Sequence, residues 1–259
     1  MVLSFAMLVF SGCNGNKVKN LSQKVIGKWM AVDRNGAPLL TNMSHIVTFE
    51  SPTEAYTTTS WIELIDRDDN PSLSKRGKSE VVIRGRKITK TVHVNPHVTV
   101  IDKMKVTSIT DSEMCGVSEV KTYIDGFTVI TSNYTSRYVK VTENYEKSIL
   151  GLWEGVVTSE MGADFDDGEH HRWEFLTDGN YRYFVWSNGE WQVNDEFSQY
   201  VMDGNMICCR WKNLGESEHE HREWWVISSL ENGVMEWTAV RERPDGTTYT
   251  STVKMNKVK

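Results

Sequence analysis

The sequence predicts an all-β protein built from two tandem antiparallel up-and-down β-barrels. Three observations lead to this prediction. Short stretches rich in Val, Ile, Thr, Tyr and Trp alternate with turn residues along the chain, and helical periodicity is almost absent. In addition, the stretch "VIGKWMA" at 25–31 returns as "ILGLWEG" at 149–155, which indicates an internal duplication.

The composition of the chain limits the classes of function. Its 259 residues are 25% charged and 39% hydrophobic, with a net charge of −6, as in a globular protein. This length suits one large domain or two small ones. A basic footprint is missing, so we expect no nucleic-acid partner. Beyond the N-terminus, no stretch approaches the roughly 18 apolar residues that a membrane-spanning helix needs.

The first twenty residues, "MVLSFAMLVFSGCNGNKVKN", are predicted to be a targeting segment and a tether. An apolar run from Val2 to Phe10 is followed by Ser11, Gly12 and Cys13. This pattern resembles the lipobox of bacterial lipoprotein signal peptides. The resemblance implies a lipid on the Cys13 thiol and attachment to the outer membrane, on its periplasmic or surface face. The alternative is an ordinary signal peptide or an apolar N-terminus with Cys13 unmodified.

The other three cysteines are an odd number once Cys13 carries a lipid, so they do not indicate a disulfide framework. No CxxC spacing indicates a zinc site or thioredoxin chemistry. Cys208 and Cys209 are adjacent in a predicted strand, so their side chains should point to opposite faces. We expect Cys115, Cys208 and Cys209 to be buried as small apolar residues.

Predicted strands cover nearly all of the chain after residue 20. Short helical turns are expected only at 21–26 and 146–150, just before each Gly-x-Trp. In the first half the predicted strands are 45–50, 55–64, 80–83, 87–94, 98–101, 104–109, 117–123, 128–134 and 137–141. In the second half they are 153–158, 171–176, 180–186, 189–193, 197–202, 206–211, 222–229, 234–242 and 247–255.

Tight turns are predicted where Asn or Asp precedes Gly, because these residues tolerate the positive φ angles of hairpin turns. A meander of such hairpins leaves two exposed edges, and closing the sheet into a barrel removes them. The five pairs in the second half are Asp178-Gly179, Asn188-Gly189, Asp203-Gly204, Asn232-Gly233 and Asp245-Gly246.

The two halves align in order at several points beyond Gly-x-Trp. "HIVTFESPTEAYTT" at 45–58 parallels "HRWEFLTDGNYRYF" at 171–184, and "NYTSRYVKV" at 133–141 parallels "TYTSTVKMNKV" at 248–258. A repeat of roughly 110–125 residues suits one eight-stranded barrel. The predicted domains are therefore the signal peptide and tether at 1–20, barrel 1 at 21–147 and barrel 2 at 148–259.

A Gly-x-Trp at the start of the first strand, a meander of strands and a turn such as "LTDGNY" resemble the lipocalin (calycin) superfamily. The likeness is greatest to lipocalin-like bacterial lipoproteins with one or two such domains. It implies that Trp29 and Trp153 plug the closed ends of the two barrels. It also implies a late arginine across each plug, namely Arg137 in the first half and Arg241 or Arg243 in the second. A large ring at a barrel end fills what would otherwise be a void.

The second half holds eight of the ten tryptophans, which makes it the expected ligand site. Strand alternation puts Tyr181 and Tyr183 on one face and separates Trp224 from Trp225. Inward rings would line a cavity for an apolar ligand or stack on sugar rings. The alternative is that the rings fill a barrel too narrow for a ligand. The cavity candidates are Trp173, Phe175, Tyr181, Tyr183, Trp191, Trp211 and Trp225.

Metal binding and catalysis have weaker support in the sequence. His219 and His221 are two residues apart, so a strand would present both to one divalent metal ion. The alternative is that these histidines lie in a solvated loop. The sequence contains no Gly-x-Ser-x-Gly elbow, phosphate loop or His-Glu-x-x-His motif, so we expect no enzyme and no cofactor.

These observations predict a membrane-anchored lipoprotein of the bacterial envelope. We expect barrel 2 to bind a small apolar or ring-bearing ligand, which includes carbohydrates, through its aromatic side chains. The alternative is a non-catalytic structural module, in which both barrels are filled and the outer surfaces contact an envelope protein partner.

Overall fold

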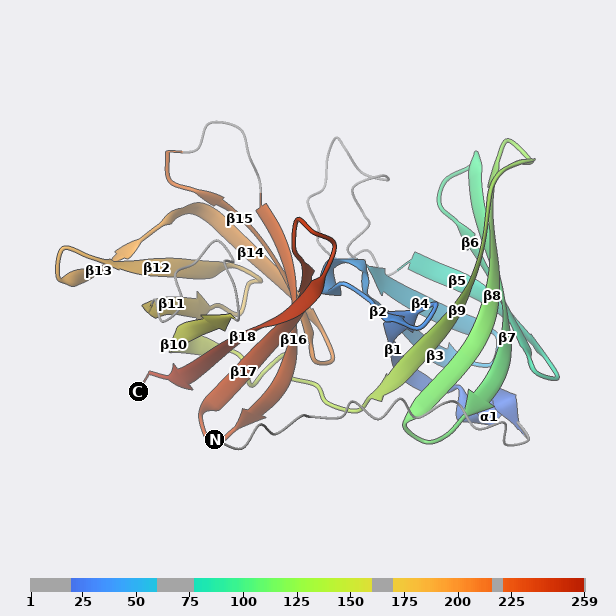
Figure 1. Ribbon diagram of the computed structural model, residues 1–259, viewed down its shortest axis with the longest axis horizontal. Helices are drawn as coiled ribbons and strands as arrows, with labels where there is room; N and C mark the ends of the chain where they lie inside the picture. The colour runs from blue at the N-terminus through green and yellow to red at the C-terminus, as the bar shows by residue number, and fades with distance from the viewer. Residues whose placement is uncertain (1–19, 60–76, 160–169, 216–220, 259) are drawn as a thin grey trace.

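The computed structural model describes residues 20–59, 77–159, 170–215 and 221–258. Two curled antiparallel sheets, one from each half of the chain, lie side by side (Figure 1). All strand pairs are antiparallel, and the described helical segments have only three or four residues. The predicted all-β fold with two barrel-like domains is therefore confirmed.

Barrel 1 is an eight-stranded sheet that closes on itself through the pairing of β1 with β9. Before β1 lies the helical turn α1 (Leu21–Lys24), and after it lie the short strand β2 (Ala37–Pro38) and the 3-10 turn η1 (Thr41–Met43). The wall strands, in order, are β1 (Gly27–Arg34), β3 (His45–Ser51), β4 (Glu54–Thr59), β5 (Gly77–Arg84), β6 (Lys87–His93), β7 (Val98–Ile109), β8 (Glu113–Ile124) and β9 (Phe127–Val141).

Barrel 2 is a nine-stranded curled sheet, and in the described part of the chain its β12 and β14 sides meet at one point. Asn180 and Gln199 form an isolated bridge there, and the amide of Tyr200 donates to the Gly179 carbonyl at 2.8 Å. Its strands are β10 (Gly151–Ser159), β11 (His170–Phe175), β12 (Tyr181–Ser187), β13 (Glu190–Val193), β14 (Asp195–Asp203), β15 (Met206–Asn213), β16 (His221–Glu231), β17 (Val234–Glu242) and β18 (Thr248–Lys257).

Some strands are longer than the sequence pattern indicated. The predicted strands 98–101 and 104–109 are one strand, β7, and 128–134 with 137–141 are one strand, β9. In β7 the pattern broke because a carboxylate, Asp102, faces the barrel interior. The helical turn predicted at 21–26 is confirmed as α1, but 146–150 is only a turn, closed by the Ile149 amide on the Tyr145 carbonyl at 3.0 Å.

The five predicted Asx-Gly turns are confirmed. In each pair the glycine has a positive φ angle, and Asn188 and Asn232 have one as well. Both residues of such a pair then adopt the left-handed region, as two-residue hairpins with right-handed twist require. Barrel 1 has the same device at Asn35-Gly36 and Asp125-Gly126.

The two Gly-x-Trp motifs make the same local structure in separate cores. Trp29 and Trp153 are fully buried, each in the core of its own barrel. The indole N–H of Trp29 donates to the Val25 carbonyl at 2.7 Å, and that of Trp153 donates to the Ile149 carbonyl at 2.6 Å. Each motif thus begins a barrel with a buried ring that has its polar atom satisfied.

The expected arginines do not pack across these rings. Lysines do so instead: Lys140 Nζ lies 5.1 Å from the Trp29 ring centroid, and Lys257 Nζ lies 5.1 Å from that of Trp153. The motif glycines make room for them, since a Cβ on Gly27 would lie 3.2 Å from Lys140 Cε. Gly151 and Lys257 repeat this distance.

The arginines that were expected at the plugs have other partners. Arg137 forms an ion pair with Glu113 at 3.1 Å, and Arg243 lies 4.7 Å from the Tyr249 ring centroid. Arg241 pairs with Glu223 in barrel 2. Each therefore lies where its strand register puts it, away from both plug rings.

The two barrels are packed on each other. Met30, Ile46 and Val141 of barrel 1 form one buried cluster with Met206, Cys208 and Trp224 of barrel 2. The turn between β14 and β15 inserts Asp203, a residue that is 4% exposed, beside this cluster.

The Asp203 carboxylate accepts hydrogen bonds from Lys28 Nζ and, at 2.5 Å, from Thr58 Oγ1, both in barrel 1. Gly204 follows it with a φ of +67°, and a Cβ there would lie 2.6 Å from a Val141 methyl. Only glycine fits this close approach, so the turn is shaped to dock on barrel 1.

The adjacent residues of β15 and β16 divide between two cores, as strand alternation predicted. Cys208 and Trp224 belong to the cluster between the barrels, whereas Cys209 and Trp225 belong to the core of barrel 2. Cys208 and Cys209 are buried thiols that take no part in a disulfide. Cys115 is buried as expected, but it is disulfide-bonded, which corrects the expectation of no disulfide; its partner is not among the described residues.

Within the described ranges, no helix is long and apolar enough to cross a membrane.

Candidate functional site

The wall of barrel 2 opens between β16 and β17. Their ladder runs from Glu231–Val234 to Val226–Thr238 and stops there, although both strands continue. Beyond this point β16 pairs only with β15, and β17 pairs only with β18. The backbone groups that face the opening therefore need other partners.

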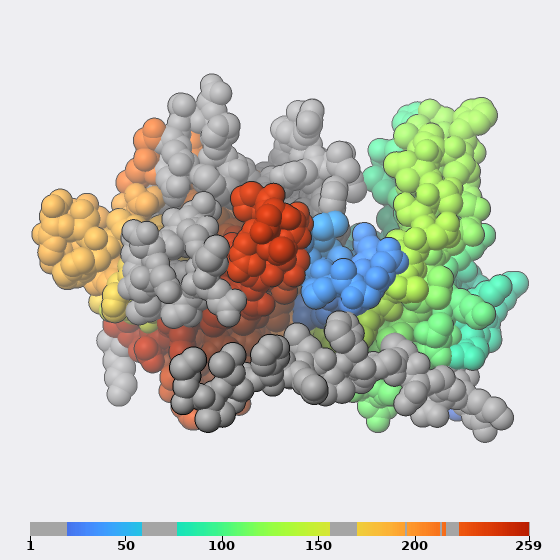
Figure 2. All heavy atoms as spheres, viewed as in Figure 1, coloured from blue at the N-terminus to red at the C-terminus, as the bar shows by residue number. Residues whose placement is uncertain are grey.

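Barrel 1 supplies one of these partners. The 3-10 turn η1 contacts both β16 and β17 at the opening. The amide of Val240, which has no ladder partner on this side, donates to Thr41 Oγ1 at 2.7 Å. In Figure 2 the last hairpin of the chain, in red, lies against the blue segment that contains η1. The opening is thus built by both halves of the chain.

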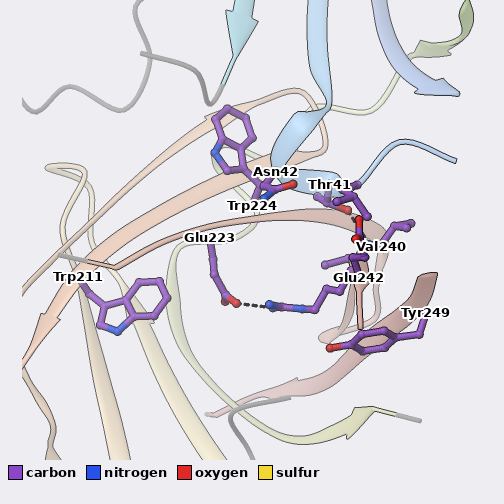
Figure 3. Close-up of a pocket in the computed structure, with 11 residues that line it drawn as sticks. Thr41, Asn42, Trp211, Glu223, Trp224, Val240, Glu242 and Tyr249 are labelled. Atoms are coloured by element: carbon purple, nitrogen blue, oxygen red, sulfur yellow. Dashed lines mark hydrogen bonds and ion pairs between the residues drawn. The ribbon is translucent and has the colours of Figure 1, made fainter. Parts of the chain in front are cut away.

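A cleft of about 430 Å³ lies at this opening, and we refer to it as the wall cleft. Figure 3 shows the lining residues on both sides of β16. Trp211, Glu223 and Tyr249 lie on one side of it, and Trp224, Asn42 and Thr41 lie on the other. Volumes of roughly 300–1,000 Å³ are typical of small-molecule sites. The lining residues are Leu40, Thr41, Asn42, Trp211, Glu223, Trp224, Ala239, Val240, Arg241, Glu242 and Tyr249.

An ion pair lies in the wall cleft, marked by the dashed line in Figure 3. Arg241 Nη2 donates to Glu223 Oε1, and Trp225 Nε1 donates to Glu223 Oε2 at 3.0 Å. The Arg241 guanidinium carbon lies 4.7 Å from the Trp225 ring centroid. Both carboxylate oxygens are therefore engaged, whereas Arg241 Nε is buried with no hydrogen-bond partner among the described residues. That N–H is a donor available to a ligand.

Most of the predicted cavity residues pack against one another inside barrel 2. The ring centroids of Trp173 and Trp237 are 5.7 Å apart, and those of Phe175 and Tyr200 are 5.0 Å apart. Such offset and edge-on contacts are typical of a filled aromatic core. The five predicted residues found in this buried core are Trp173, Phe175, Tyr181, Tyr183 and Trp225.

The other two candidates lie elsewhere. Trp191 is on the β12–β13 hairpin, where it contacts Trp186 at 5.3 Å and lies 4.3 Å from the Arg172 guanidinium carbon. Trp211 is half-buried at the edge of the core and lines the wall cleft. The structure therefore brings Trp211 together with Trp224 and Tyr249, which the sequence did not group.

His171 is buried in barrel 2 and is 1% exposed. Burial, followed by the charge of His170, lowers the pKa of His171 to about 4, so the ring is neutral near pH 7. Its Nδ1 is hydrogen-bonded to the Tyr183 hydroxyl.

The predicted metal ligands and the predicted lipidation site lie at or outside the ends of the described ranges. Cys13 and His219 lie outside the described residues, and for His221 only the backbone is described, in β16. Among the described side chains, no three His, Cys, Asp or Glu residues form a group that could hold a metal ion. The metal pair and the lipid site stay predictions.

No family model matches this sequence, and no curated protein matches it. Among solved structures, a protein of unknown function from the DUF3598 family of Nostoc punctiforme is similar with a TM-score of 0.29 and 10% identity. That match covers 92% of this chain and 97% of the other.

Two mutants of transferrin binding protein B from Haemophilus parasuis are similar with TM-scores of 0.27 and 0.24. They are 9% and 10% identical, and each match covers 86% of this chain. This chain spans 62% of their length. Likeness at this level carries no conclusion about activity, so the function must be argued from the site itself.

Proposed function

We propose that this protein is a non-enzymatic binding module of the bacterial envelope that holds a small ring-bearing ligand in the wall cleft. The cleft where the β16–β17 ladder opens carries this proposal. It combines flat side chains, Trp211 and Tyr249, with an unpartnered buried donor, Arg241 Nε. Catalysis is not part of the proposal; a substrate-dependent rate lost on changing one acidic residue would contradict it.

The lining of the cleft suggests the chemistry of the ligand. Aromatic side chains bind rings of sugars or aromatic compounds through their faces. The Arg241 Nε–H has no acceptor among the described residues: Glu223 Oε1 accepts from Nη2 of the same guanidinium, and Glu223 Oε2 accepts from Trp225. A ring that carries a carbonyl or ether oxygen satisfies both features.

Intrinsic fluorescence tests the proposal on the full chain. Methyl glycosides, indole and benzamide would be titrated, and we expect quenching or a blue shift for at least one of them. Trp211→Phe should abolish the response, and Arg241→Met should weaken it about tenfold, as the loss of one charged hydrogen bond predicts. The matched control is Trp186→Phe, which removes an indole that is 55% exposed outside the cleft. A silent panel, or an equal loss in both tryptophan variants, would overturn the proposal.

The envelope location rests on the resemblance of the N-terminus to a lipobox. We expect the protein in membrane fractions, with acyl mass on the N-terminal fragment, and Cys13→Ser should release it. The structure has Cys115 in a disulfide whose partner lies outside the described residues, and an acylated Cys13 could not be that partner. The state of Cys115 therefore gives a second measurement. Intact masses with and without reductant separate a lipid on Cys13 from a Cys13 that is bonded to another cysteine. A Cys13 that is bonded to another cysteine would contradict the proposed lipid anchor, but it would not affect the proposed ligand site in the wall cleft.

A second candidate function, contact with an envelope protein, is favoured by the tip of the β8–β9 hairpin. Phe127 is 77% exposed, Ile130 58% and Val129 50%, on a tip that projects from the molecule (Figure 2). Apolar side chains grouped on a protruding tip are typical of interaction sites. Photo-crosslinking from Thr128 in cells should give a defined adduct that Phe127→Ser removes. Absence of any adduct would exclude this candidate.

A further inference from the structure

The interior of barrel 1 contains a level of polar residues above an apolar base. The base is the buried core around Trp29, which includes Val47, Ile88 and Met104. Six polar residues, each on a different strand, lie at the next level. Each of them is either two positions along its own strand from a core residue, or directly opposite an inward-facing residue of the neighbouring strand. We call them the polar ring: Arg34, His45, Ser79, Lys90, Asp102 and Ser118.

The polar ring contains a buried ion pair and several polar atoms that can still form hydrogen bonds. Lys90 and Asp102 are opposite each other on β6 and β7, with Nζ and Oδ2 3.0 Å apart and side chains 11% and 13% exposed. Asp102 Oδ1 is buried and has no hydrogen-bond partner among the described residues. The hydroxyls of Ser79 and Ser118, 0% and 1% exposed, are also buried without one. Buried polar atoms of this kind nearly always have a partner, which is a protein group, an ordered water or a ligand, so these atoms are open to a bound group.

The charge of the polar ring is positive. Arg34, whose guanidinium carbon lies 4.4 Å from the Tyr134 ring centroid, and Lys90 face one carboxylate, that of Asp102. Burial, followed by the charges of Lys90 and Arg34, lowers the pKa of His45 to about 3, so this ring is neutral near pH 7. One positive charge therefore remains without a counter-ion among the described residues of the ring, which favours an anion.

Barrel 1 also has smaller side chains than barrel 2 at matching positions. Trp29 pairs with Val47 where Trp153 pairs with Trp173, so the two walls have the same register. Val47 pairs with Thr57 where Trp173 pairs with Tyr183. Two large rings of barrel 2 are thus replaced by two small side chains directly below and beside the polar ring.

We propose that the polar ring of barrel 1 binds a small organic acid that also carries a hydroxyl group. The carboxylate would be attracted by Lys90 and Arg34, and the ligand hydroxyl would donate to Asp102 Oδ1. Ser118 adds a hydroxyl that both donates and accepts. This site is separate from the wall cleft, and it does not depend on the ligand of barrel 2.

Calorimetry on the full chain with three probes tests the chemistry. Glycerate has both groups, propionate lacks the hydroxyls, and glycerol lacks the carboxylate. We expect glycerate to bind at least tenfold more tightly than propionate, and glycerol not to bind. Absence of heat with glycerate, or equal binding of all three probes, would overturn the proposal.

Variants test the residues. Lys90→Met with Asp102→Leu removes both charges without leaving one unpaired, and it should abolish glycerate binding. Lys103→Met, on the outer face of β7, is the matched control and should bind as the natural chain does. Ser118→Ala should weaken glycerate about tenfold, and it supplies an independent result if the double variant does not fold. Undiminished binding in a folded double variant or in Ser118→Ala would overturn the proposal.

A last pair of variants separates this site from the wall cleft. Thr57→Tyr introduces the ring that barrel 2 has at the matching position and should block glycerate. Trp211→Phe, which should abolish binding in the wall cleft, should leave glycerate binding unchanged. Glycerate binding that is lost in Trp211→Phe and kept in Thr57→Tyr would place the acid in the wall cleft and refute the proposal.

Discussion

The two barrels have the same wall in matching register, and they differ in what fills it. In both, the Gly-x-Trp strand supplies a buried indole, and a lysine near the end of the last wall strand covers it. In both, an inward-facing histidine near the start of the next wall strand has a lowered pKa. Barrel 2 then fills its interior with aromatic rings, whereas barrel 1 has small and charged side chains.

This difference shows which positions of a duplicated barrel are required for the fold and which can change. Closing the wall needs the plug, its glycine and the tight turns, and these are present in both halves. The interior above the plug needs only to be filled or solvated, so its residues can diverge toward packing or toward binding. The following four predictions test this comparison.

The largest effect is expected at the plugs. Trp29→Ala and Trp153→Ala should each destabilise the protein by about 3–5 kcal/mol, because each removes a fully buried ring and leaves a cavity. Denaturant unfolding followed by circular dichroism measures the loss. Trp186→Ala, at an exposed ring, should cost less than about 1 kcal/mol. If a plug variant lost as little stability as this control, its indole would not be needed for the stability of that barrel.

The next largest effect concerns the contact between the barrels. Asp203→Ala should cost about 3 kcal/mol, since it leaves Lys28 and Thr58 without their buried acceptor. Calorimetric unfolding should then separate into two transitions, one for each barrel. Asp125→Ala is the control, because its pair with His97 is exposed and should contribute little. One unshifted transition in Asp203→Ala would mean that this contact does not couple the barrels.

The inward-facing histidines, His45 and His171, should make both barrels sensitive to acid. Their folded pKa values, about 3 for His45 and about 4 for His171, lie below the usual histidine pKa of 6.5. The unfolded chain therefore takes up protons first as the pH falls below 6.5. Each histidine should cost about 2 kcal/mol of stability between pH 7 and pH 5. This loss should continue toward the folded pKa.

Unfolding titrations at pH 7 and pH 5 measure this dependence. His45→Gln and His171→Gln should each reduce it by the amount of one histidine. Trp186→Phe, at an exposed ring that does not titrate, should leave it unchanged. A dependence that persists in full in either histidine variant would show that another group titrates in that barrel.

The smallest effect is expected at the lysines above the plugs. Lys140→Met and Lys257→Met keep the aliphatic stem and remove the charge, so each should cost about 0.5–1 kcal/mol. Thermal unfolding at matched pH measures it, with Lys103→Met as a surface control. Unequal costs in the two barrels would weaken the view that the plug and its lysine are one duplicated unit.

Much of the fold was predictable from local sequence. Asx-Gly pairs fixed the hairpins because few other residues adopt positive φ angles, and alternation correctly divided Trp224 from Trp225. The lysines above the plugs were missed because the family resemblance implied arginine. The repeat carried the signal, since the aligned segments contain Lys140-Val141 and Lys257-Val258.

The wall cleft and the polar ring could not be predicted in the same way. Trp211 and Tyr249 belong to strands that read as ordinary core strands, and nothing local indicates that the β16–β17 ladder stops at Val226. Asp102 interrupted an apolar pattern and was therefore read as a break between strands. Its meaning depends on Lys90 across the sheet.

The sequence by itself determined the all-β class, the duplication, the turns and the two buried indoles. These depend on side-chain period and on backbone angles, which are properties of neighbouring residues. Only the tertiary structure decided how the barrels dock through Asp203, where the wall opens and which charges meet inside barrel 1. Those features depend on pairing between residues far apart in the chain, and the local pattern of either partner does not specify them.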